Sequence, residues 1–122
     1  MAKLILLVDD EPDLAFVTKT RLESAGYKVW AVATAEEAFA YLQENMPDLV
    51  LLDLLLPKMQ GKEFCRLLKS DTRLKRLPVI LFTANASDIP KLVEEINADG
   101  YLLKPCEPSV LLKTIKKAME RE

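Results

Sequence analysis

The chain has 122 residues, of which 50% are apolar and 30% are charged, and its formal net charge is −2. This size and balance are typical of one globular domain, and the charge gives no basic footprint for nucleic acid or an anionic membrane. No apolar run approaches the ~20 residues needed to cross a bilayer, and no cleavable signal sequence precedes the first apolar segment. We therefore expect a cytoplasmic protein with a single domain over residues 1–122.

Cysteine and histidine usage narrows the possible chemistry. Cys65 and Cys106 are far apart and have no metal-ligand spacing, so two free thiols are expected in a reducing compartment. The chain contains no histidine. That absence excludes Ser-His-Asp and Cys-His catalysis, histidine-ligated zinc and a phosphohistidine carrier.

Strand-like and helix-like segments alternate along the chain. The expected strands are residues 3–8, 28–32, 49–52, 79–82 and 101–103. The expected helices are residues 12–25, 34–44, 61–69, 88–97 and a last one that starts at residue 108. The first helix begins at Pro12 and stops at Gly26, and Thr34 with Glu37 forms a capping box for the second.

The spacing of apolar residues predicts which side of each helix faces the sheet. The residues expected to face it are Leu14, Thr18, Leu22 and Ala25, then Ala38, Phe39 and Leu42, then Phe64, Leu67 and Leu68, and finally Val110, Leu111, Ile115 and Met119. Phe16 falls on the outer side of the first helix.

This order predicts an α/β fold of (βα)5 type, a doubly wound, flavodoxin-like parallel sheet of five strands. Right-handed crossovers favour the strand order 2-1-3-4-5, in which strands one and three are neighbours. Asp9 and Asp10 follow the first strand and Asp53 follows the third. Because the carboxyl ends of parallel strands share one edge, we expect these three carboxylates to lie together.

The residues at this edge favour metal-assisted phosphoryl chemistry. Three neighbouring carboxylates need a counter-charge, and Mg²⁺ prefers such oxygen ligands while it keeps several waters. If Asp53 attacked a phosphoryl group, Thr83 and Lys104 at the ends of strands four and five would bind phosphoryl oxygens. No nucleotide-binding loop is present, so the phosphoryl donor must be another molecule.

Each residue also has an ordinary structural interpretation. Asp10 could cap the first helix, Asp9 could stabilise a turn, Thr83 is a common strand residue, and Lys104 could be a solvated charge. Only their conjunction at one edge favours the functional interpretation. The other acids near strand and helix ends are assigned to turns and caps: Asp48, Asp88 and Asp99.

Four segments resemble the receiver domain of two-component response regulators, including the stand-alone chemotaxis-type form. They are Leu-Leu-Val-Asp9-Asp10-Glu11-Pro12, Asp48-Leu-Val-Leu-Leu-Asp53-Leu-Leu-Leu-Pro57-Lys-Met-Gln-Gly61, Phe82-Thr83-Ala84 and Tyr101-Leu-Leu-Lys104-Pro105. The resemblance implies that Asp53 is the phosphoacceptor, with Thr83 and Lys104 as phosphoryl-binding partners. It implies Mg²⁺, or Mn²⁺ in its place, held by Asp10, Asp53 and the backbone carbonyl of Leu55, with Asp9 acting through a water.

The same resemblance implies a phosphorylation-activated signalling switch and not an enzyme, although the domain assists its own phosphorylation and dephosphorylation. The donor would be a sensor histidine kinase or phosphotransfer protein, the downstream target is unknown, and the protein would be a monomer or a weak phosphorylation-dependent dimer. Thr83 and Tyr101 would form the switch pair, and the Lys104–Pro105 bond would be cis. The residues expected to dock the kinase are Asp13, Val17, Thr20 and Arg21, with Phe16 as a further contact.

The chain departs from the family pattern at a few positions. Leu56 replaces a common methionine, Gln60 a common acid, and Cys106 a common aromatic residue. Leu55 and Asn85 occupy the two variable positions that resemble those tuning phosphoryl lifetime. Because Leu55 offers no group that could position a water, we expect a phosphoform that lasts minutes to hours.

Four alternatives fit less well. A haloacid-dehalogenase-like phosphatase would need an acid where Leu55 stands, and a flavodoxin-like flavin protein would need a Ser/Thr-rich loop after the first strand. A nicotinamide-binding domain would need G-x-G-x-x-G, which is absent. A degenerate receiver would lack one of the five site residues, and all five are present.

Overall fold

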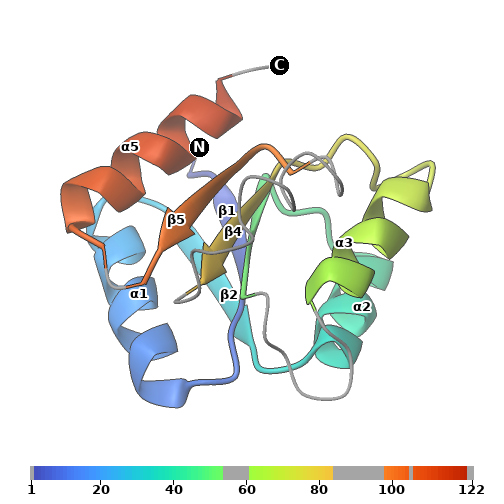
Figure 1. Cartoon of the computed structure of the whole chain (residues 1–122), viewed down its shortest axis with the longest axis horizontal. Coiled ribbons are helices and arrows are strands. Elements are labelled where there is room, and N and C mark those ends of the chain that lie inside the picture. Colours follow the sequence, from blue (N-terminus) through green and yellow to red (C-terminus); the bar gives the residue numbers. More distant parts are fainter. Residues whose placement is uncertain (1, 54–60, 84–97, 105, 121–122) are drawn as a thin grey trace.

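The computed structural model describes residues 2–53, 61–83, 98–104 and 106–120 (Figure 1). The strands are β1 (Leu4–Val8), β2 (Lys28–Val32), β3 (Leu49–Leu52), β4 (Val79–Thr83) and β5 (Gly100–Leu103). The described helices are α1 (Pro12–Ser24), α2 (Ala35–Glu44), α3 (Gly61–Ser70) and α5 (Pro108–Met119). The helix expected over residues 88–97 lies outside the described residues.

The strands form one parallel sheet in the order β2-β1-β3-β4-β5, which confirms the predicted topology. Helices α1 and α5 cover one face of this sheet and α2 and α3 cover the other (Figure 1). Among the described helices, none has the length and apolar character needed to cross a membrane.

Alternate residues of the central strands enter two separate cores, because successive side chains of a strand point to opposite faces. In β1, Leu6 and Val8 pack with α2 and α3, whereas Ile5 and Leu7 pack with α1 and α5. All four residues are almost completely buried. A strand that is covered on both faces has a continuous apolar sequence. For this reason the bounds predicted for β1, β3 and β4 lie close to the observed ones.

Three residues predicted to face the sheet are exposed instead. Leu67 and Val110 are 42% and 47% exposed. Each immediately precedes a buried leucine of its helix, and one residue step rotates the side chain by about 100° away from that buried stripe. Ala25 is exposed because α1 ends at Ser24 and the chain has begun to turn there.

The turn after α1 requires the glycine for its backbone conformation. Gly26 has φ of 98°, in the left-handed region that favours glycine. A Cβ at this position would meet no atom within 4 Å, so the requirement is conformational and not spatial. The hydrogen bond from Tyr27 N–H to the Leu22 carbonyl then closes the helix end.

Neither cysteine takes part in a disulfide, as predicted. Cys65 is buried among the residues that pack α3 on the sheet, and burial raises the pKa of its thiol to about 11. It is therefore protonated at neutral pH, and its role is packing.

Candidate functional site

Asp9 and Asp53 extend two neighbouring central strands by one residue at the same level. The β1–β3 register pairs Val8 with Leu52, the residues that precede the two acids. The Asp53 N–H donates to the Val8 carbonyl at 2.9 Å, which fixes the backbone of Asp53 against β1. The strand order therefore brings residues distant in sequence to one point at the carboxyl edge, as predicted.

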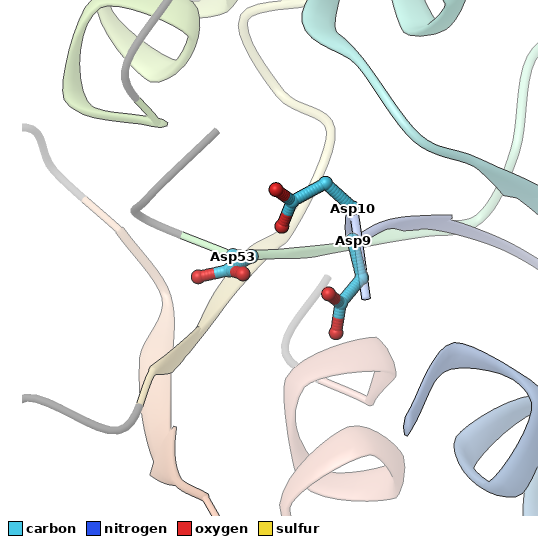
Figure 2. A group of neighbouring side chains, drawn as sticks. All are labelled: Asp9, Asp10 and Asp53. Atoms are coloured by element: carbon cyan, nitrogen blue, oxygen red, sulfur yellow. The ribbon is translucent and has the colours of Figure 1, made fainter. Parts of the chain in front are cut away.

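Three carboxylates gather at this point. Figure 2 shows Asp9 and Asp10 at the end of β1 and Asp53 at the end of β3. One oxygen from each carboxylate lies within 4.8 Å of the others. Asp9 and Asp53 are only 3% and 5% exposed, whereas Asp10 is open to solvent.

The side chain of Lys104 reaches into this cluster from the end of β5. Its Nζ donates to Asp9 Oδ2 at 2.7 Å and to Asp53 Oδ2 at 3.2 Å. Only 5% of the Lys104 side chain is exposed, so these are contacts of a nearly buried ion. Glu11 supplies a longer, more exposed contact, with Oε1 at 3.9 Å from Nζ.

Burial alone would lower the pKa of the Lys104 ammonium, because it disfavours the charged form. The hydrogen bond to Asp9 and the charges of Asp53 and Asp9 outweigh that effect and raise the pKa above its usual value. Lys104 is therefore a fixed positive charge between two buried carboxylates at physiological pH.

Asp9 also performs the turn role that the sequence left open as an alternative. Its Oδ1 accepts the Glu11 N–H at 3.0 Å, while its Oδ2 binds Lys104. The same carboxylate thus shapes the turn into α1 and holds the lysine. Asp10 does not cap α1: the N-cap residue is Glu11, and its side chain makes no capping hydrogen bond.

The donor set fits a hard divalent cation. Carboxylate oxygens are the ligands that Mg²⁺ selects, and it usually keeps several waters. The exposed carboxylate of Asp10 leaves such waters room beside the buried Asp53. Asp9, Asp10 and Asp53 each offer one oxygen to such an ion.

Several predicted site residues can be placed only in part. Thr83 is the last residue of β4 and pairs with Leu103 of β5, at the carboxyl edge as expected. Leu55, Asn85 and Pro105 lie outside the described residues, so the Leu55 carbonyl ligand, the lifetime position and the cis bond stay predictions. Tyr101 is 48% exposed, and its role as a switch also stays a prediction.

The predicted docking residues form an exposed strip on α1. Its members are Asp13, Phe16, Val17, Thr20 and Arg21. Phe16 is 70% exposed, as expected from its place off the buried stripe. Burial raises the pKa of the Cys106 thiol, and the charge of Arg21 opposes that shift. Cys106 packs against the core that α1 and α5 cover.

Two neighbours of Lys104 were not found from the sequence, Glu11 and Phe82. The Phe82 ring lies beneath the ammonium, with 5.3 Å from Nζ to the ring centre. Glu11 directly follows Asp9-Asp10 and Phe82 directly precedes Thr83. Neither position predicts a contact with Lys104 until the side-chain directions are known.

Comparisons with known proteins agree with this geometry. Residues 5–116 match the family described as response regulator receiver domain. The chain is 35% identical over 122 residues to the phosphate regulon transcriptional regulatory protein PhoB of Pseudomonas aeruginosa, an alignment covering 99% of this chain and 53% of that protein. The chain thus spans about half the length of the curated relatives it matches.

Solved structures show the same fold. The chemotaxis response regulator CheY4 of Vibrio cholerae is 29% identical with a TM-score of 0.89, covering 97% of this chain and 99% of that one. The receiver domain of the sensor histidine kinase PA1611 from Pseudomonas aeruginosa is 29% identical with a TM-score of 0.89, covering 98% of both chains, and has a magnesium ion coordinated in its active site cleft. The chain therefore belongs to the family of response regulator receiver domains.

Proposed function

We propose that Asp53 is the phosphoacceptor and that a sensor histidine kinase or phosphotransfer protein supplies the phosphoryl group. The observation that carries the proposal is the Lys104 ammonium held by both Asp9 and Asp53 at adjacent strand ends. A cation fixed beside a carboxylate is suited to bind the oxygens of a phosphoryl group arriving there.

In the proposed step, an Asp53 carboxylate oxygen forms a bond to phosphorus. The bond from phosphorus to the donor nitrogen breaks, and its electron pair stays on the donor imidazole, which takes up a proton from solvent. The Lys104 ammonium would bind one phosphoryl oxygen as negative charge develops there. The Thr83 hydroxyl would donate a hydrogen bond to another phosphoryl oxygen. Small phosphodonors would react in the same way, with an oxygen as the leaving atom.

Asp10 and Asp53 would hold Mg²⁺, or Mn²⁺ in its place, with the Leu55 carbonyl, and Asp9 would contribute through a bound water. When bound, the ion neutralises charge on the phosphoryl oxygens. Residues of the chain would position the ligands of the ion. The backbone of Asp53 is hydrogen-bonded to β1, and the Asp9 carboxylate is hydrogen-bonded to the Glu11 N–H and the Lys104 ammonium. The protein thus assists its own phosphorylation and dephosphorylation.

Phosphorylation would bias a two-state switch that a downstream partner reads. The new phosphoryl charge would draw Thr83 and Lys104 toward Asp53, and Tyr101 would turn inward from its half-exposed position. The altered face around β5 would bind the downstream target, or a second copy in a weak phosphorylation-dependent dimer. Two cysteines that form no disulfide fit a cytoplasmic protein, where this kinase reaction would take place.

The test is phosphate uptake from a small phosphodonor with Mg²⁺, followed by intact mass. We expect one phosphoryl group on the wild type and none on Asp53→Asn. The matched control is Asp48→Asn, because Asp48 is an acid at the opposite end of the same strand and its amide oxygen can still accept the Leu4 N–H. Equal uptake by the wild type and Asp53→Asn would refute the assignment.

A further inference from the structure

The buried ammonium of Lys104 also lies over an uncharged group, the ring of Phe82. The distance of 5.3 Å from Nζ to the ring centre lies within the ~6 Å range over which the face of an aromatic ring attracts a cation. Phe82 is 4% exposed and the lysine side chain 5%, so water does not screen this contact strongly.

The position of the ring is fixed more firmly than that of the lysine. Phe82 pairs with Leu102 across β4 and β5, and both belong to the core covered by α1 and α5. Lysine reaches the site on a flexible four-carbon stem. The packed ring therefore limits how far the ammonium can withdraw from Asp9 and Asp53.

A neutral partner suits this place better than a further acid. Another carboxylate would bind the ammonium strongly. It would then compete with the phosphoryl oxygens, which must replace some of the carboxylate contacts that Lys104 makes before phosphorylation. The ring stabilises the charge through its quadrupole, without an oxygen that would have to be displaced. It also offsets part of the cost of keeping a charged group away from water.

We propose that Phe82 is a positioning residue, which holds the Lys104 ammonium between Asp9 and Asp53 so that it meets the incoming phosphoryl group without rearrangement. This inference rests on the function proposed above, because the benefit of the placement is faster phosphorylation of Asp53. It does not depend on which kinase supplies the phosphoryl group.

Fluorinated phenylalanines at residue 82 test the proposal with little change of shape. Each added fluorine weakens the negative face of the ring, so the rate of phosphorylation by a small phosphodonor should fall stepwise, by about tenfold at trifluorophenylalanine. The control is the same series at Phe39, whose ring packs on Phe64 with centres 4.7 Å apart. That series should leave the rate unchanged, and equal rates along the Phe82 series would overturn the proposal.

A second measurement needs neither metal nor phosphodonor, and separates failure of this inference from failure of the proposed function. In NMR spectra, the ring should shift the Lys104 side-chain protons upfield. Phe82→Leu should remove the shift and Phe82→Tyr should retain it, whether or not Asp53 accepts phosphate. If Asp53 is phosphorylated normally and Phe82→Leu changes neither the shift nor the rate, Phe82 has no positioning role.

Discussion

The two ends of the sheet use aspartate in opposite ways. At the amino end, Asp48 accepts the Leu4 N–H at 2.7 Å and donates its own N–H to the Leu4 carbonyl at 2.7 Å. Asp99 repeats this arrangement with Val79, at 2.8 Å for both contacts. Each of these acids thus binds the first backbone groups of a neighbouring strand, a structural role of a kind other than the turns and caps expected for them.

At the carboxyl end the acids face one another instead. Asp9, Asp10 and Asp53 converge within 4.8 Å, and the Lys104 ammonium lies between two of them. Asp48 and Asp99 each accept a backbone N–H from the strand beside them, and Asp99 also lies 3.7 Å from the Lys69 ammonium. Acids gathered around one cation form a charged cluster instead, and we interpret that difference in neighbours as the difference between a structural aspartate and a reactive one.

The largest effect should come from the lysine. Lys104→Met should slow phosphorylation by a small donor by about 10²–10³-fold, because a preorganised charge near the phosphoryl oxygens is lost. The matched control is Lys69→Met at the amino end, where Nζ lies 3.7 Å from Asp99 Oδ2. That variant should phosphorylate at the wild-type rate. If Lys104→Met and Lys69→Met slowed phosphorylation equally, the functional distinction between the carboxyl and amino ends of the sheet would be contradicted.

Asp10→Asn should weaken Mg²⁺ binding by at least about tenfold, because it removes a charged ligand from the cluster. Titration with Mg²⁺ followed by NMR measures this directly. Asp48→Asn should bind the ion as the wild type does. Unchanged affinity in Asp10→Asn would show that Asp10 is not a ligand.

The amino end should instead control stability. Asp48→Ala leaves the partly buried Leu4 N–H without its side-chain acceptor, which should lower the free energy of unfolding by about 1–3 kcal/mol. Urea denaturation measures the loss. Phosphorylation per folded molecule should not change, and a slower reaction at equal folded concentration would contradict the structural role.

The smallest predicted effect concerns the lifetime of the phosphoform. Leu55 has no polar group to steady an attacking water, so the wild type should lose its phosphate over minutes to hours. Leu55→Asn should shorten that lifetime by about tenfold, which corresponds to ~1.4 kcal/mol of barrier. A wild-type lifetime of seconds, measured by phosphate release, would show that Leu55 does not protect the phosphoryl group.

The sequence predicted the sheet and the gathering of Asp9, Asp10 and Asp53 at its carboxyl edge, because both follow from strand order. The apolar runs located the central strands, and the order 2-1-3-4-5 then placed Asp9 beside Asp53. It also placed Lys104 near Asp9, although 95 positions separate them in the chain. Packing restricts the order of parallel strands to few choices, so distant residues could be brought together without coordinates.

The directions of individual side chains were harder to predict. The prediction that Leu67 and Val110 face the sheet was wrong, because the buried stripe of a helix is narrower than the run of apolar residues that marks it. The contacts of Glu11 and Phe82 with Lys104 depend on the rotamer of a long lysine, which its partners decide. Periodicity predicts the face on which a residue lies but not the atom that it meets.

Locating the phosphoryl group is the most direct test of the account. Borohydride reduction of the phosphorylated wild type converts an acyl phosphate on aspartate into homoserine, which tandem mass spectrometry can place in the sequence. We predict homoserine at residue 53 alone, with Asp48, at the opposite end of β3, untouched. Homoserine at residue 9, 10 or 48 in place of residue 53 would contradict the claim that the carboxyl end of the sheet presents Asp53 as its reactive acid.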